Sequence, residues 1–220
     1  SPVGLYKEMI RDHEENGTSY KDILTFNLDE YIGLPRDHRE SYWTFMHQNL
    51  FNYIDIPDEN VHVPLGCGED PEADCRAYEA ELSRHIVDVQ VLGIGSDGHI
   101  AFNEPFTSLA SRTGVRNLTT DTRIVNSRFF GNDPEAVPAQ ALSVGVGTVT
   151  DSKEVLILIN GHNKAKALAE TVEGSVSHKW TCSALQMHNG AIIACDEAAC
   201  DELTVGAYKY FLDIEKKERL

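Results

Sequence analysis

The chain lacks an excess of positive charge. Its 220 residues contain 19 lysines and arginines against 35 aspartates and glutamates, which gives a formal net charge of −16. Because the phosphates of nucleic acids are bound by basic surfaces, this balance argues against a nucleic-acid partner. A small phosphorylated ligand needs only a few local donors, so the charge balance does not exclude it.

Long apolar runs and paired cysteines are also missing. No run approaches the ~18 apolar residues of a membrane-spanning helix, and no signal peptide is visible. The five cysteines are Cys67, Cys75, Cys182, Cys195 and Cys200. Their odd number and the absence of a C-x-x-C pair predict reduced thiols in a cytoplasmic protein and argue against a metal site. We therefore expect no membrane partner and no metal.

What the sequence does contain is an alternation of strand and helix patterns. Residues 155–159 form a continuous β-branched run, which is typical of a central strand in a parallel sheet. This alternation predicts an α/β fold, a three-layer α/β/α Rossmann-like open sheet that is mostly parallel. We expect one domain over residues 1–220, with a possible active-site lid over residues 114–143, where periodicity is weak. The expected strands are 23–28, 61–63, 87–94, 155–159 and 191–195, and the expected helices are 2–15, 38–51, 71–85, 162–172 and 204–217.

The strand predicted at 87–94 ends in a glycine-rich loop that contains Asp97, His99 and Glu104. The glycines of residues 93–98 match G-x-G-x-x-G, the pattern of a dinucleotide-binding turn, but that turn needs a helix at its last glycine. Pro105 would break such a helix, so we reject this interpretation.

A histidine between two carboxylates suits general acid–base catalysis near neutral pH. Asp29 and Glu30 end a second expected strand. Taken alone, the group Asp97, His99 and Glu104 is also compatible with a solvated turn, and the pair Asp29 and Glu30 with a solvated strand end. Both sets follow strands of one parallel sheet, however, whose carboxyl ends share an edge where ligands bind, so we expect them to converge.

Three residues are candidates for binding an anion. Lys164 lies between the strand at 155–159 and the helix that follows it, where free N–H groups favour negative charge. Arg128 lies in the possible lid, and a surface arginine stacked on its aromatic neighbours is the alternative. Ser1 precedes the first expected helix and would be a third phosphate contact.

Taken together, these motifs resemble the glucosamine-6-phosphate deaminase family, from Ser1 nearly to Leu220. That family converts glucosamine 6-phosphate and water to fructose 6-phosphate and ammonia without a cofactor. The segments that carry the resemblance are 26–31, 93–105, 127–130, 141–148, 180–181 and 195–197.

The resemblance implies a role for each candidate residue. His99 would open the pyranose ring, with Asp97 and Glu104 orienting it, and Asp29 would move a proton from C2 to C1. Ser1, Arg128 and Lys164 would bind the phosphate.

The resemblance also raises two expectations about what this sequence lacks. Family members begin with an apolar strand and a threonine- and glycine-rich loop before the position of Ser1, so we expect the first strand to be missing from this chain. Hexameric bacterial members carry an allosteric site, for which Thr107, Ser108, Arg116 and Tyr210 are the candidates. Gly114 stands where those members have an arginine.

Other functions stay open at this point. A sugar-phosphate lactonase or isomerase on a related fold and a non-catalytic sugar-phosphate sensor are the alternatives. A homo-oligomer, hexameric or smaller, is compatible with the family pattern.

Overall fold

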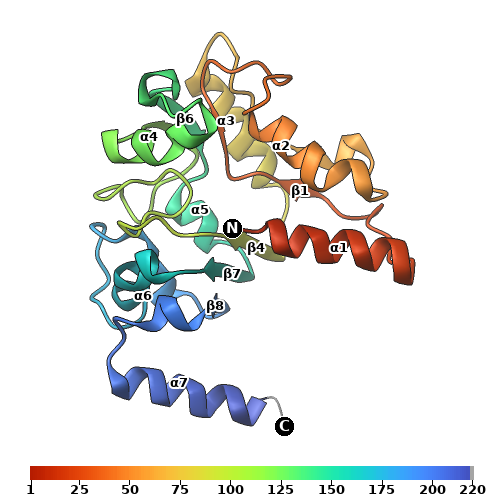
Figure 1. Cartoon of the computed structure of the whole chain (residues 1–220). Helices are drawn as coiled ribbons and strands as arrows, with labels where there is room; N and C mark the ends of the chain where they lie inside the picture. The colour runs from red at the N-terminus through yellow and green to blue at the C-terminus, as the bar shows by residue number, and fades with distance from the viewer. Residues whose placement is uncertain (219–220) are drawn as a thin grey trace.

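The computed structural model describes residues 1–218 (Figure 1). Its helices are α1 (Val3–Asn16), α2 (Tyr42–Asn49), α3 (Pro71–Leu82), α4 (Thr120–Asn126), α5 (Val146–Thr150), α6 (Ala165–Val172) and α7 (Val205–Glu218). Its strands are β1 (Thr25–Phe26), β2 (Asp29–Tyr31), β3 (Val61–His62), β4 (Val89–Leu92), β5 (Gly114–Asn117), β6 (Gln140–Ser143), β7 (Glu154–Ile159) and β8 (Ala191–Cys195). The strands pair into three short sheets, β1-β3, β2-β6-β5 and β4-β7-β8.

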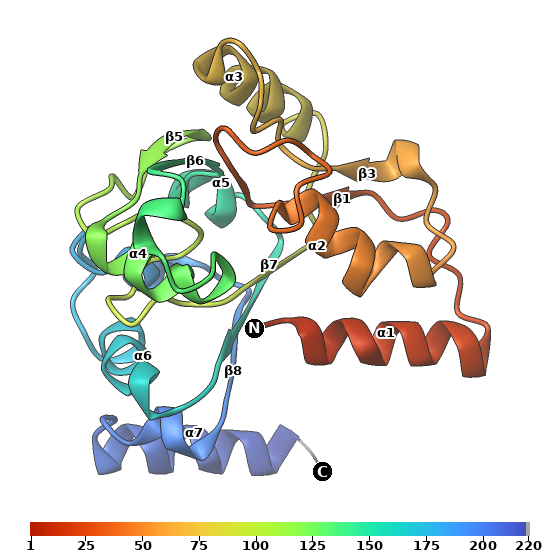
Figure 2. The ribbon, with the colours of Figure 1, turned by 45° about the horizontal axis from the view of Figure 1, so that its top comes forward.

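The sheet β4-β7-β8 is parallel and forms the centre of the molecule. Its middle strand β7 alternates exposed or half-buried residues with Val155, Ile157 and Ile159, which are fully buried. These side chains pack against α5, α6 and the 3-10 helix η6 (Thr181–Met187) in the largest apolar cluster. Figure 2 shows β7 and β8 running side by side, with α6 next to them. The parallel pairing brings the carboxyl ends of β4 and β7 to the same edge.

The sheet β2-β6-β5 is antiparallel, and two of its strands come from a region without periodicity in the sequence. β6 pairs with β2 on one side and with β5 on the other, so that Ser143 lies opposite both Asp29 and Gly114. The segment expected to be a lid therefore begins and ends in strands of a sheet. α4 and two 3-10 helices lie between those strands.

The remaining pair, β1-β3, lies beside α1 and α2. Apolar residues of the two helices and of β3 form a second cluster, centred on Met46, Leu50 and Phe51. The strand expected over 23–28 is shorter than predicted, because the chain pairs with β3 at Thr25–Phe26 and only enters the antiparallel sheet at Asp29.

The predicted fold class is confirmed, since parallel β-strands alternate with helices in an α/β Rossmann-like arrangement. The first and last expected helices agree with α1 and α7 within about two residues, which is the usual uncertainty of helix ends. The helix expected over 38–51 begins later, at Tyr42, because Ser41 is the N-cap and accepts the N–H of Thr44. The last two residues of the expected 1–220 domain lie outside the described part of the chain.

Candidate active site

The loop after β4 owes its shape to its glycines. A Cβ on Gly95 would come within 2.5 Å of both Asp97 Oδ1 and His99 Nδ1, so only glycine leaves room for these side chains. Gly98 has φ +80°, a left-handed conformation that glycine adopts without strain. The turn closes through a hydrogen bond from Gly95 N to the carbonyl of His99, 2.8 Å long. The glycines that match the dinucleotide-binding pattern therefore allow the side chains of Asp97 and His99 to contact each other.

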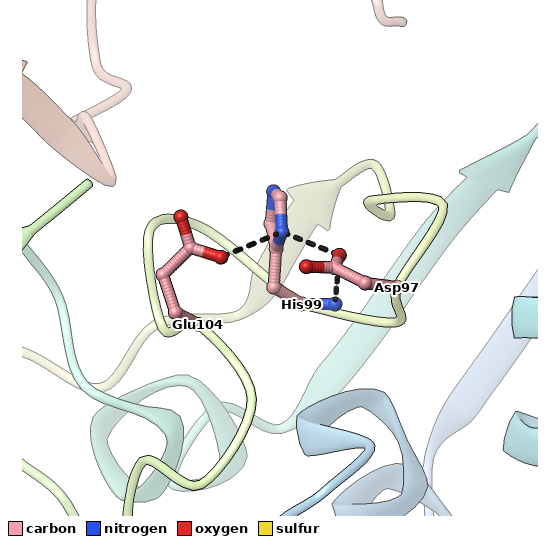
Figure 3. Close-up of side chains that lie close together, drawn as sticks. All are labelled: Asp97, His99 and Glu104. Atoms are coloured by element: carbon pink, nitrogen blue, oxygen red, sulfur yellow. Dashed lines mark hydrogen bonds and ion pairs between the residues drawn. The ribbon is translucent and has the colours of Figure 1, made fainter. Parts of the chain in front are cut away.

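His99 lies between two carboxylates (Figure 3). Its Nδ1 is 2.7 Å from Oδ1 of Asp97 and 3.5 Å from Oε2 of Glu104. The charge and hydrogen-bonding of His99 outweigh partial burial and hold the pKa of Asp97 below its usual value. Nδ1 of His99 and Oε2 of Glu104 are both buried, and neither has an aligned hydrogen-bond partner. The structure therefore brings together the three residues that the sequence predicted.

The second oxygen of Glu104 is held from the segment between β5 and β6. Oε1 accepts hydrogen bonds from the hydroxyl of Thr122, at 2.6 Å, and from the backbone and hydroxyl of Thr119, at 3.2 and 3.3 Å. Thr119 is the N-cap of α4. These contacts leave Oε2 free to face His99, so α4 fixes the orientation of a buried carboxylate beside the imidazole.

Asp29 is the first residue of β2 and has an unusual electrostatic environment. Burial and, after it, the negative charge of Glu30 raise its pKa from 3.8 to about 7, while the charge of His99 acts in the opposite direction. Asp29 is thus close enough to His99 for their charges to interact. A carboxylate with a pKa near neutrality can both accept and return a proton at that pH.

Glu30 points away from the site and anchors the strand. It is 2% exposed and accepts three backbone N–H groups, those of Tyr31, Tyr42 and Trp43, at 2.9 to 3.1 Å. Two of these donors belong to the first turn of α2, whose N–H groups have no partner within the helix. Glu30 therefore ties α2 to β2 and fixes the backbone on which Asp29 stands.

Two cations, Lys164 and Arg128, lie within electrostatic reach of each other, and Lys164 also senses the charge of Asp97. Burial lowers the pKa of Lys164, the charge of Asp97 opposes this shift, and the charge of Arg128 adds to it. Ser1 lies within electrostatic reach of both Arg128 and Lys164. The Ser1 hydroxyl lies over the backbone of Gly93, where a Cβ would come within 2.7 Å of its oxygen. Within residues 1–218, neither Lys164 nor Arg128 has a carboxylate partner in an ion pair. Arg128 stacks its guanidinium 4.7 Å from the centre of the Phe129 ring, as the alternative interpretation expected. This contact does not neutralise its charge, so both cations are available to an anion.

The four residues expected at an allosteric site do not form a cluster within this chain. The guanidinium of Arg116 donates hydrogen bonds to Asn103 Oδ1 and to the backbone carbonyls of Arg112 and Val115. Thr107 and Ser108 follow the site loop, and Ser108 lines an open surface hollow of about 630 Å³. Tyr210 is exposed on α7, which Figure 2 shows at the far end of the molecule from β5.

Asp97, His99 and Glu104 also have the ligand types of a metal site. Their ligand atoms lie within 4.8 Å of one another, close enough for a divalent ion. The same ligand types in the same arrangement also suit proton transfer by an imidazole between two carboxylates.

Comparison with known protein families identifies the family of this chain. Residues 1–194 match the family described as glucosamine-6-phosphate isomerases/6-phosphogluconolactonase. The chain belongs to this family. The residues that the site brings together, from Ser1 to Lys164, all fall inside the matched range.

Relatives within the family are named for one of its activities. The chain is 58% identical, over 217 residues, to a glucosamine-6-phosphate deaminase of Phocaeicola vulgatus, covering 98% of this chain and 82% of that protein. It is 52% identical to the glucosamine-6-phosphate deaminase of Aliivibrio fischeri, covering 99% of this chain and 82% of that protein.

Solved structures agree with this placement. A monomeric glucosamine-6-phosphate deaminase superposes with a TM-score of 0.88 at 41% identity, covering 90% of this chain and 82% of that one. A 6-phosphogluconolactonase from Thermotoga maritima superposes with a TM-score of 0.65 at 20% identity, covering 89% and 81%. The latter likeness shows a common fold and nothing about the reaction.

Two further residues, Ser143 and Thr181, shape the site from outside its loop. Ser143 lies opposite Asp29, and its hydroxyl accepts the N–H of Phe102 in the site loop at 3.0 Å. Thr181 donates to the carbonyl of Asn103 at 2.9 Å from the other side. Both residues belong to motifs that carry the family resemblance, but only their contacts across the fold reveal what they hold.

Proposed function

We propose that this chain converts glucosamine 6-phosphate and water to fructose 6-phosphate and ammonia. The observation that carries the proposal is His99, whose Nδ1 lies 2.7 Å from Asp97 and 3.5 Å from Glu104, with the carboxylate of Asp29, whose pKa is raised, within electrostatic reach. Moving a proton between two carbons of a sugar needs one group that both takes and returns it. Relatives at 52 and 58% identity, named glucosamine-6-phosphate deaminase, support this choice within the family.

The phosphate of the substrate would bind to Lys164, Arg128 and Ser1. Lys164 and Arg128 lack carboxylate partners within the described chain, and the charge of Arg128 acts on Lys164, so a dianion placed between them relieves their mutual repulsion. Binding energy from this remote group can orient the reacting carbons against Asp29 and His99.

The first chemical step is opening of the pyranose ring at His99. The imidazole takes the proton of the anomeric hydroxyl and delivers a proton to the ring oxygen, which gives the open-chain aldehyde. Asp97 and Glu104, at 2.7 and 3.5 Å from Nδ1, stabilise the positive charge that the ring carries during this exchange.

The second step belongs to Asp29. Its carboxylate takes the proton from C2 while the aldehyde oxygen gains a proton, which leaves an enol-type amine across C1 and C2. The same carboxyl then returns its proton to C1 as the nitrogen releases one, so that in total one hydrogen moves from C2 to C1 and one from nitrogen to O1. The product is an imine at C2. Addition of water to this imine and loss of ammonia give fructose 6-phosphate.

A sugar-phosphate lactonase is the second candidate, because the family description includes that activity. Lactone hydrolysis has no C2 proton to remove, so it gives no role to the raised pKa of Asp29. The two candidates separate in one assay, in which purified protein receives either glucosamine 6-phosphate or 6-phosphogluconolactone. The proposal expects ammonia and fructose 6-phosphate from the first substrate. Lactone hydrolysis without ammonia release would overturn it, and binding of the amino sugar without turnover would favour a sensor.

We also propose that the segment between β5 and β6 covers the bound substrate. It carries Arg128 beside the phosphate site and holds Glu104 through Thr119 and Thr122, so its position is coupled to both halves of the site. No helix of residues 1–218 has the length and apolar character needed to cross a membrane. A cytoplasmic location, a homo-oligomeric assembly and the allosteric residues stay predictions from the sequence.

A further inference from the structure

Two thiols meet at the carboxyl end of β8. Cys195 is the last residue of this strand, and Cys200 is the last residue of the 3-10 helix η7 (Glu197–Cys200) that follows. Their Sγ atoms are 3.6 Å apart. Cys195 is exposed and Cys200 is half-buried, whereas Cys75 and Cys182 are buried. Both members of the pair are thus accessible to a reagent in solution.

We propose that Cys195 and Cys200 form a reversible intramolecular disulfide, which makes the end of β8 an oxidation site. A disulfide needs the sulfurs about 2.05 Å apart. The required approach of roughly 1.5 Å is small enough for side-chain rotation and a limited shift of η7. The two thiols already contact each other, since either one can donate its S–H to the other.

The oxidant would be a peroxide. The thiolate of Cys200 attacks one peroxide oxygen, the O–O bond breaks, and Cys200 becomes a sulfenic acid as the other oxygen leaves as water or an alcohol. Cys195 then attacks this sulfur, the S–OH bond breaks, and the thiol proton leaves with the hydroxyl as water. Two thiols are oxidised and one peroxide is reduced. Burial, together with the neighbouring Cys200, raises the pKa of Cys195, and the reaction balances in the same way whichever of the two thiols attacks first.

The segment that the disulfide would bend also holds the loop before Lys164. Asp196 lies between the two cysteines in the chain, and its carboxylate accepts the N–H of Gly161 at 2.9 and 3.0 Å. The same carboxylate caps η7 through the N–H of Ala199 at 2.9 Å. Oxidation that shifts η7 therefore also shifts the partner of Gly161, three residues before Lys164.

This coupling gives the modification a functional consequence that rests on the proposed phosphate contact of Lys164. Oxidised protein should bind glucosamine 6-phosphate with a KM raised on the order of threefold to tenfold, as expected for weakening one charge-assisted contact. The kcat should change little, because Asp29 and His99 lie on other segments.

The test treats the folded full chain with hydrogen peroxide and then maps disulfides by mass spectrometry of peptides, with and without a thiol reductant. We expect a Cys195–Cys200 linkage, lighter by two hydrogen atoms and reversed by the reductant. C195S and C200S must each abolish the linkage, while C67S, which removes the other exposed thiol, must leave it intact. Free thiols at both positions after treatment, a sulfinic acid at Cys200, or a disulfide between two chains would each overturn the proposal.

Kinetics of the same samples test the coupling separately. We expect the raised KM in oxidised wild type and C67S, and no change in treated C195S and C200S. An intact disulfide with unchanged KM would refute the link to Lys164. Reduced protein that releases no ammonia at all would refute the proposed function but leave the peptide result standing.

Discussion

The raised pKa of Asp29 predicts that the ionised carboxylate destabilises the folded protein at neutral pH. Burial, and then the charge of Glu30, move this pKa from 3.8 to about 7. Each pKa unit corresponds to about 1.4 kcal/mol of free energy, so the full effect on the free energy of unfolding is about 4 kcal/mol.

The pH dependence follows from which state ionises first. Below pH 3.8 the carboxyl is protonated in both the folded and the unfolded chain, and its ionisation has no effect on stability. As pH rises from there to about 7, the unfolded state loses the proton first, so folding becomes progressively less favourable. Above about pH 7 both states are ionised and the loss of stability reaches its plateau.

Asp29→Asn removes this ionisation and keeps the shape of the side chain. The free energy of unfolding of the variant, measured by urea denaturation, should exceed that of the wild type by an amount that grows with pH. Between about pH 5 and about pH 8 the difference should increase by roughly 2 to 3 kcal/mol. Comparing the two pH values cancels any effect of the amide that does not depend on ionisation. A difference that stays constant with pH would refute the argument that Asp29 is held protonated by its surroundings.

Three further variants test how the neighbours act on the site. Glu30→Gln removes the charge beside Asp29, so the acidic limb of the plot of kcat against pH should move to lower pH. The free energy of unfolding should fall by about 1–3 kcal/mol, because one backbone N–H loses its acceptor. An acidic limb that does not move would exclude Glu30 as a cause of the raised pKa of Asp29. Thr122→Val deletes the 2.6 Å hydrogen bond from the Thr122 hydroxyl to Glu104 and should lower kcat with little change in KM. If steady-state kinetics give the same kcat for the variant and the wild type, this contact does not orient Glu104. Lys164→Ala should raise the KM for glucosamine 6-phosphate roughly tenfold or more; an unchanged KM would place the phosphate elsewhere.

Local patterns in the sequence predict the central parallel sheet and the part of the site around His99. The apolar run of β7 and the loop with Asp97, His99 and Glu104 are contiguous in the chain, so their structure follows from short-range rules. The histidine and its two carboxylates were predicted together because only six residues separate the first from the last of them.

The antiparallel sheet could not be predicted in the same way. Its pairing sets Asp29 opposite Ser143, two residues that are far apart in the sequence, and neither β2 nor β6 is long enough to show a period of two. The sequence around β6 has no periodic pattern that would predict a strand, and only the pairing in the structure reveals one. The buried contact of Thr122 with Glu104 and the meeting of Cys195 with Cys200 depend on the fold in the same manner.

Ammonia release by the wild type and by Asp29→Asn, measured side by side with glucosamine 6-phosphate, tests the central claim most directly. The account predicts one ammonia for each fructose 6-phosphate from the wild type, and a loss of at least a hundredfold in kcat for the variant, as expected for removing a general acid–base group. Ammonia released by Asp29→Asn at the wild-type rate would contradict the assignment of Asp29 as the proton carrier, and no ammonia from the wild type would contradict the proposed reaction itself.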